Sequence, residues 1–193
     1  MNMRNSRSVL FAALAIVMAI TRFSPATAVI HLQDASWAVF FLAGFYLVNQ
    51  WRWAFPALMV EAVLIDYVAI EYLGVSNYCV TAAYWFLVPS YAALWAGGSW
   101  LHRHHSMDFR GFSRLVASAS GGISLCFLIS NASFYWIGSR VAVPTWDGWL
   151  ANFSDWYWPF LRAPLAYVGA GAMMHVIVIQ GRKLLEHDSV QQN

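Results

Sequence analysis

The sequence has few charged residues and lacks the short motifs of nucleotide, dithiol and zinc chemistry. Only 10% of its 193 residues are Asp, Glu, Lys or Arg, whereas a soluble domain has about 25%. A G-x-x-x-x-G-K-[S/T] phosphate loop, a C-x-x-C pair and an H-E-x-x-H pattern are absent, so we expect no ATP hydrolysis, dithiol exchange or zinc site of these kinds. A basic run with interleaved aromatic residues, typical of nucleic-acid binding, is also absent.

What the chain has in abundance is apolar sequence, at 60% of its residues. A membrane-crossing helix needs about 20 mostly apolar residues, and strict alternation of the kind found in barrel strands is absent. No repeat or low-complexity linker divides the chain, which predicts one domain over residues 1–193. The sequence therefore predicts an all-α integral membrane bundle of six transmembrane helices, over residues 9–24, 36–49, 53–73, 81–101, 113–137 and 158–181.

The positions of Lys and Arg predict how this bundle is oriented. With the N-terminus inside, eight of the 11 basic residues lie in cytoplasmic segments, and only Arg22, Arg140 and Arg162 lie outside. An even number of spans then places the C-terminus in the cytoplasm as well. The external segment 139–157 contains several aromatic residues, which fit either an interfacial belt or the cap of a pocket that opens outward.

Cys79 is the most informative single residue. It lies in the predicted external loop 74–80, where an oxidising compartment favours thiols that have a partner or a function. The other cysteine, Cys126, lies within a predicted span at a depth that makes a disulfide with Cys79 improbable. No other metal-ligating residue is near Cys79 in the sequence, so its sulfur suits a metal that already carries most of its ligands, as inside a macrocycle.

Carboxyl groups within apolar spans are costly and usually functional. Asp66 lies about two helical turns from the Cys79 loop and is expected to face the same outward cavity. The alternative for Asp66 is an ion pair or hydrogen bond inside the bundle, with Arg22 or a tyrosine hydroxyl. Glu61 lies deeper and on a different side of the helix, which argues against an acid pair with Asp66.

Two histidines and one serine leave other functions open. An intramembrane serine hydrolase of the rhomboid kind would use Ser99 and His175, although Trp100 stands where a glycine is expected. A haem-binding membrane protein would use Cys79, His175 or the external His31 as iron ligands. The simplest interpretation of His175 is a structural hydrogen bond within the bundle.

Taken together, the six predicted spans, the Ala15-x-x-x-Ala19 pattern and the placed cysteine in Asn77-Tyr78-Cys79 resemble a known family. The chain resembles the substrate-binding S components of energy-coupling-factor vitamin transporters, and the cysteine resembles that of the BtuM family of small cobalamin transporters. The resemblance covers the whole chain and implies a bacterial inner-membrane protein that takes up cobalamin (vitamin B12).

The resemblance also implies roles for individual residues. Cys79 would be the axial ligand of the cobalt, and by ligand exchange it would labilise an upper cyano ligand. Ala15 and Ala19 would contact an energy-coupling-factor scaffold that works with two ATPases, although BtuM-type proteins often occur without a dedicated set of these partners. The candidates for contacts with the amide-rimmed corrin ring are Asp66, Asn77, Tyr78, Tyr84 and Tyr135.

Overall fold

The computed structural model describes the backbone of residues 3–22 and 33–191, and the side chains of residues 6–22 and 33–181. These residues are mostly helical and contain no β-strand, which confirms the predicted all-α class. The α-helices of the described part are α1 (Met3–Arg22), α3 (Ser36–Tyr46), α4 (Trp51–Leu73), α5 (Leu87–His104), α6 (Phe109–Ile137) and α7 (Trp146–Gln191). Short 3₁₀ turns lie at Val48–Gln50 (η1), Asn77–Cys79 (η2) and Ala82–Phe86 (η3).

Three helical segments are long and apolar enough to cross a membrane: Val48–Leu73, Phe109–Ile137 and Trp146–Gly181. They indicate a membrane protein, because their hydrophobic lengths match a hydrocarbon core of about 30 Å. Helix α3 is apolar as well, but its 11 residues are too few to span that thickness as a helix.

Several helix boundaries differ from those predicted from the apolar runs, including the starts of α5 and α7. Residues 81–86, predicted as the start of a span, form the turn η3, in which the Thr81 hydroxyl accepts a hydrogen bond from the Ala83 N–H at 3.2 Å. Helix α5 then begins at Leu87, which places Pro89 in its first turn, where proline is tolerated. Helix α7 begins at Trp146 rather than at residue 158, so much of the segment predicted as an external loop is helical.

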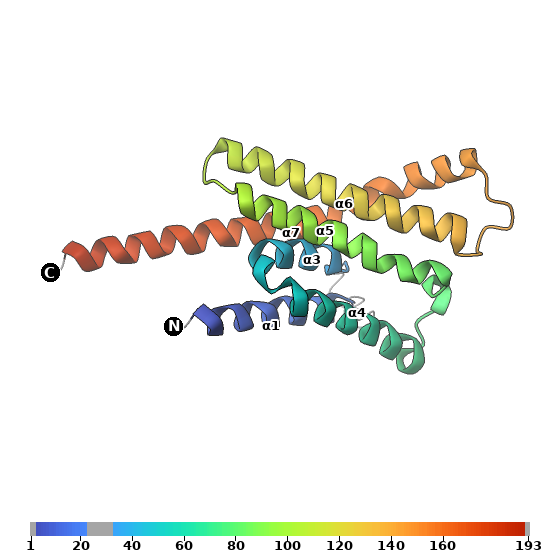
Figure 1. Ribbon diagram of the computed structural model, residues 1–193, viewed down its shortest axis with the longest axis horizontal. Coiled ribbons are helices and arrows are strands. Elements are labelled where there is room, and N and C mark those ends of the chain that lie inside the picture. Colours follow the sequence, from blue (N-terminus) through green and yellow to red (C-terminus); the bar gives the residue numbers. More distant parts are fainter. Residues whose placement is uncertain (1–2, 23–32, 192–193) are drawn as a thin grey trace.

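Close packing of α3 against α5 forms the centre of the bundle (Figure 1). A Cβ atom added at Gly98 would overlap the Phe41 carbonyl, and one added at Gly44 would overlap the backbone of Trp95. The two backbones therefore touch, as small residues allow in membrane helices. The Ser99 hydroxyl crosses the same contact and donates a hydrogen bond to the Gly44 carbonyl at 3.1 Å.

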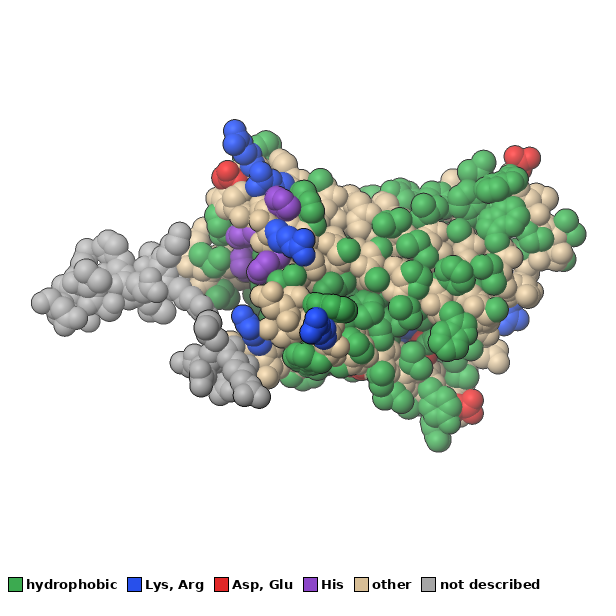
Figure 2. Space-filling model, in the orientation of Figure 1, with side chains coloured by type: hydrophobic (Ala, Val, Ile, Leu, Met, Phe, Trp, Pro, Cys, Tyr) green, Lys and Arg blue, Asp and Glu red, His purple; other side chains and the backbone are tan. Residues whose placement is uncertain are grey.

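The two ends of the bundle differ in character. At one end, α4 and α6 finish, α5 and α7 begin, and the turns η2 and η3 connect α4 to α5 (Figure 1). We call this the cavity end. At the other end, near both chain termini, Lys, Arg and His side chains gather on the surface (Figure 2). We call this the basic end; α5 finishes there with the run His102, Arg103 and His104.

Candidate functional site

A cavity of about 510 Å³ opens at the cavity end between α4, α5, α6 and α7. Four of the residues predicted to contact a ligand line it together: Asp66, Tyr78, Cys79 and Tyr84. Its other lining residues are mostly aromatic or polar, namely Arg22, Ala83, Phe86, Leu87, Phe127, Ser130, Asn131, Ser133, Phe134, Asn152, Trp156 and Phe160. The cavity therefore combines apolar walls with a few polar groups, as small-molecule sites usually do.

Cys79 ends the turn η2 and is exposed, with its thiol free. The turn is held locally, because the Ser76 hydroxyl accepts a hydrogen bond from the Tyr78 N–H at 3.2 Å and the Val80 N–H donates to the Asn77 carbonyl at 2.9 Å. The second cysteine, Cys126, is fully buried in the core and also free. The prediction that the two cysteines do not pair is confirmed.

The turn that carries Cys79 is tied to the loop between α6 and α7. The Arg140 Nε donates a hydrogen bond to the Tyr78 carbonyl at 3.1 Å, and the Arg140 guanidinium lies 4.8 Å from the centre of the Tyr78 ring. On α6, the Phe134 ring lies 5.6 Å from the same tyrosine ring. A cation over an aromatic face is attractive, so these contacts hold the cysteine beside α6.

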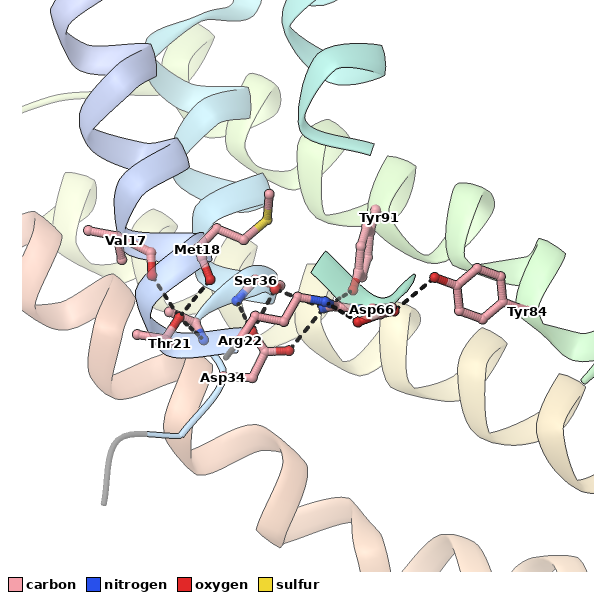
Figure 3. A network of polar contacts seen from close by, with 10 residues as sticks. Val17, Met18, Thr21, Arg22, Asp34, Ser36, Asp66, Tyr84 and Tyr91 are labelled. Carbon is pink, nitrogen blue, oxygen red and sulfur yellow. Dashed lines mark hydrogen bonds and ion pairs between the residues drawn. The ribbon is translucent and has the colours of Figure 1, made fainter. Parts of the chain in front are cut away.

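Asp66 makes both an ion pair with Arg22 and a hydrogen bond with a tyrosine hydroxyl, which the sequence left as alternatives. Its two carboxylate oxygens accept hydrogen bonds from Nε and Nη2 of Arg22, each at 2.7 Å (Figure 3). The Tyr84 hydroxyl donates to the same carboxylate at 2.8 Å. Asp66 also lines the cavity, so the ion pair and the cavity position coexist.

Arg22 is the centre of a network that joins four helices. Its third nitrogen, Nη1, donates to Asp34 at 3.1 Å, to the Ser36 hydroxyl at 2.9 Å and to the Tyr91 hydroxyl at 3.2 Å (Figure 3). The Arg22 side chain is only 11% exposed, and a guanidinium so deeply buried requires such partners. The network ties the ends of α1, α3, α4 and α5 together on one side of the cavity.

Two asparagines that the sequence analysis did not single out complete the polar lining. The Asn131 amide on α6 donates to the Asn152 side-chain oxygen on α7 at 2.8 Å, and the Trp149 indole donates to the Asn131 oxygen at 3.0 Å. The available signal was a polar amide in an apolar run, which is expensive in a membrane. The Asn152 amide nitrogen makes no hydrogen bond to another described group, so both of its protons are available to a ligand.

Other predicted residues lie away from the cavity lining. Tyr135 is buried in α6, and its hydroxyl accepts a hydrogen bond from the Thr145 N–H at 3.4 Å, which supports the start of α7. Asn77 lies in η2 but does not line the cavity. On α1, Ala15 packs against the core, and both Ala15 and Ala19 are partly buried.

The residues of the alternative functions lie apart from one another. The Ser99 hydroxyl donates to the Gly44 carbonyl, whereas His175 Nδ1 is 3.0 Å from the Tyr46 hydroxyl. His175 also packs against the ring of His105, near the basic end. His31 lies outside the described residues. Thus neither a Ser99–His175 dyad nor a histidine on the cavity wall occurs in the described part of the chain.

Chemically, the cavity offers one sulfur, one partly neutralised carboxylate, amide groups and aromatic walls. Among the side chains that the structure describes, those of residues 6–22 and 33–181, no group of three His, Cys, Asp or Glu could hold a metal ion. The Cys79 sulfur could therefore supply a single ligand to a metal that enters with its other ligands already in place.

Comparison with known proteins adds no relative to these observations: no protein-family model matches the chain, and no curated protein matches it significantly.

Proposed function

We propose that this chain binds cobalamin in the cavity and takes part in its uptake across a bacterial inner membrane. The main support for the proposal is that Cys79, which is exposed and unpaired, lines the same cavity as Asp66 and Tyr84. The resemblance of the sequence to the BtuM family and to the S components of vitamin transporters points in the same direction.

The chemistry of the sulfur suits this substrate. The corrin ring supplies four nitrogens to cobalt and leaves two axial positions, so one protein ligand is sufficient. A cysteine thiolate is a strong, soft donor, and Cys79 reaches the cavity without a competing disulfide. Bound on one face of the ring, the thiolate weakens the bond on the opposite face, so an upper cyanide leaves with its bonding electron pair while cobalt keeps its oxidation state.

The remaining lining suits the periphery of the ring, which carries carboxamide side chains. Amides donate to carboxylates and accept from amide N–H groups, and the cavity presents Asp66 and the free protons of Asn152. Phe127, Phe134 and Trp156 supply apolar surface for the ring itself. A volume of about 510 Å³ is within the usual range for ligand sites, and the open side leaves the rest of the molecule outside.

In this proposal the six α-helices of the described residues form the membrane bundle, and both termini face the cytoplasm. The cavity end then faces outward, where the vitamin arrives. Ala15 and Ala19 on α1 are the proposed contacts with an energy-coupling-factor scaffold, whose ATPases would supply the energy that this chain, without a phosphate loop, does not.

A titration of the purified protein with cyanocobalamin tests the proposal. We expect the absorbance spectrum to change on binding to the wild type, and calorimetry to give an affinity at least about tenfold weaker for Cys79→Ala, the equivalent of about 1.4 kcal/mol. The matched control is Cys126→Ala, which removes the other thiol, a buried one that does not line the cavity. Its spectrum should follow the wild type.

Two results would overturn the proposal: no binding of cobalamin by the wild type, or the same spectrum and affinity for Cys79→Ala. A Soret band in the purified protein would instead support haem. Labelling by a fluorophosphonate that is lost in Ser99→Ala would support a serine hydrolase.

A further inference from the structure

A second pocket, of about 450 Å³, lies at the basic end, the end of the bundle opposite the cavity. It is formed where α5 ends and α4 begins, and its lining residues are Val48, Asn49, Trp51, Arg52, His102 and Arg103. Two of these six side chains are guanidinium groups, and none is acidic. The pocket therefore has the charge of an anion-binding site.

The positive charge of this pocket is not neutralised within the described part of the chain. Neither Arg52 nor Arg103 makes an ion pair there. Arg52 lies with its guanidinium 5.9 Å from the centre of the Trp51 ring, a contact that orients the group and leaves its charge unpaired. Asp108, the acidic residue closest to Arg103 in the sequence, accepts hydrogen bonds from the Ser106 hydroxyl and the Gly111 N–H and does not line the pocket.

The position of the pocket relative to the apolar segments indicates which class of anion it binds. It lies at the start of the apolar segment Val48–Leu73, one of the three long enough to cross a membrane. Trp51, Trp53 and Trp100 are 56%, 47% and 44% exposed around this level, and exposed tryptophans concentrate where a bilayer meets water. Further along α4, exposed apolar side chains such as Val60 and Leu64 offer a surface for acyl chains.

We propose that this pocket binds the phosphate of an anionic phospholipid headgroup, held between Arg52 and Arg103. Guanidinium groups pair with phosphate through two parallel hydrogen bonds, and basic pockets between membrane helices bind anionic headgroups. The acyl chains lie along the apolar surface of α4, which a soluble phosphate would not use. The site is separate from the cavity, so it stands whether or not the chain binds cobalamin.

The test uses the full-length protein in a neutral detergent and counts bound lipid by native mass spectrometry. Dioctanoyl phosphatidylglycerol is the anionic probe, and dioctanoyl phosphatidylcholine is the zwitterionic one. We expect Arg52→Gln/Arg103→Gln to lower the affinity for phosphatidylglycerol roughly 25-fold, because each arginine near the membrane surface contributes about fivefold. The matched control is Arg7→Gln/Arg110→Gln, which removes the same charge from two exposed arginines outside the pocket.

Retained binding in the control, together with its loss in the pocket variant, would support the proposal. Both pairs are exposed, so folding should be intact, and circular dichroism of each variant checks this. Equal losses in both variants would show diffuse charge attraction and overturn the proposal, as would equal binding of phosphatidylcholine. Displacement of the lipid by inorganic phosphate at constant ionic strength would identify a free-phosphate site and overturn the lipid assignment.

Discussion

Replacing Asp66 by alanine should destabilise the cavity end more than any other loss of a single carboxylate there. Asp66 accepts two hydrogen bonds from Arg22 and one from Tyr84, all between 2.7 and 2.8 Å. The Asp66→Ala protein retains a guanidinium whose side chain is 11% exposed and whose remaining anionic partner is Asp34.

The size of this effect follows from what remains after the substitution. Removing one partner of a buried ion pair costs about 3–5 kcal/mol, because the other charge stays buried and unpaired. Asp66 itself is 24% exposed, and Asp34 still partly neutralises Arg22. We therefore expect a loss of about 2–3 kcal/mol in the free energy of unfolding.

The assay is equilibrium unfolding in mixed micelles, with a titration of sodium dodecyl sulfate followed by circular dichroism. Glu71→Ala is the matched control, because Glu71 is an exposed carboxylate on the same helix, and it should change stability by less than about 0.5 kcal/mol. Arg22→Met/Asp66→Ala should cost less than the sum of the two single substitutions, since the double variant contains no unpaired guanidinium.

Two outcomes would refute this reasoning. If Asp66→Ala were as stable as Glu71→Ala, the hydrogen bonds between Arg22 and Asp66 would not contribute to the free energy of unfolding. If the losses in the two single variants simply added in the double variant, Arg22 and Asp66 would not be coupled, and their short contacts would have no energetic meaning.

The remaining predictions concern helix packing and a helix start. Gly98→Ala should sharply reduce the yield of folded protein in size-exclusion chromatography, because the added Cβ would overlap the Phe41 carbonyl. The control Gly121→Ala should fold normally, because nothing lies within 4 Å of the added Cβ. Normal folding of both variants would contradict the close contact of α3 with α5. Hydrogen bonds from the Ser106 hydroxyl and the Gly111 N–H hold the pKa of Asp108 below its usual 3.8. The ionised form therefore adds stability above about pH 3.8, and this contribution disappears as the pH falls through the lower pKa of the folded protein. Asp108 is the N-cap residue of α6, and Asp108→Asn keeps a side chain that can cap the helix but should not show this component in acid unfolding. An identical pH profile for both proteins would contradict the prediction.

The sequence alone was sufficient for the class of the protein and for part of its cavity. Apolar runs predict membrane helices because burial in lipid depends on local composition, and helices do form over most of the predicted residues. Cys79, Asp66 and Tyr84 were found because they are close in the chain, in the last turns of α4 and in the turns η2 and η3 that follow it. Only short-range geometry was needed to place them together.

Boundaries were less predictable where composition and backbone bonding disagree. Residues 81–86 are as apolar as the helix that follows, yet a side-chain hydrogen bond to Thr81 and the position of Pro89 favour a tight turn. The start of α7 at Trp146 is polar enough to suggest a loop, but packing of Trp149 and Asn152 against Asn131 of α6 stabilises it as helix.

What only the tertiary structure decided is how the buried polar groups are paired. The sequence offered Asp66 a ligand, Arg22 or a tyrosine, and the folded chain gives it Arg22 and Tyr84 at the wall of a cavity. In the folded chain, His175 also forms a hydrogen bond with the Tyr46 hydroxyl, and Ser99 donates one to the Gly44 carbonyl. The physical reason is that hydrophobicity acts along each helix, whereas a hydrogen bond requires two atoms within about 3 Å, and that distance is set by how the helices pack.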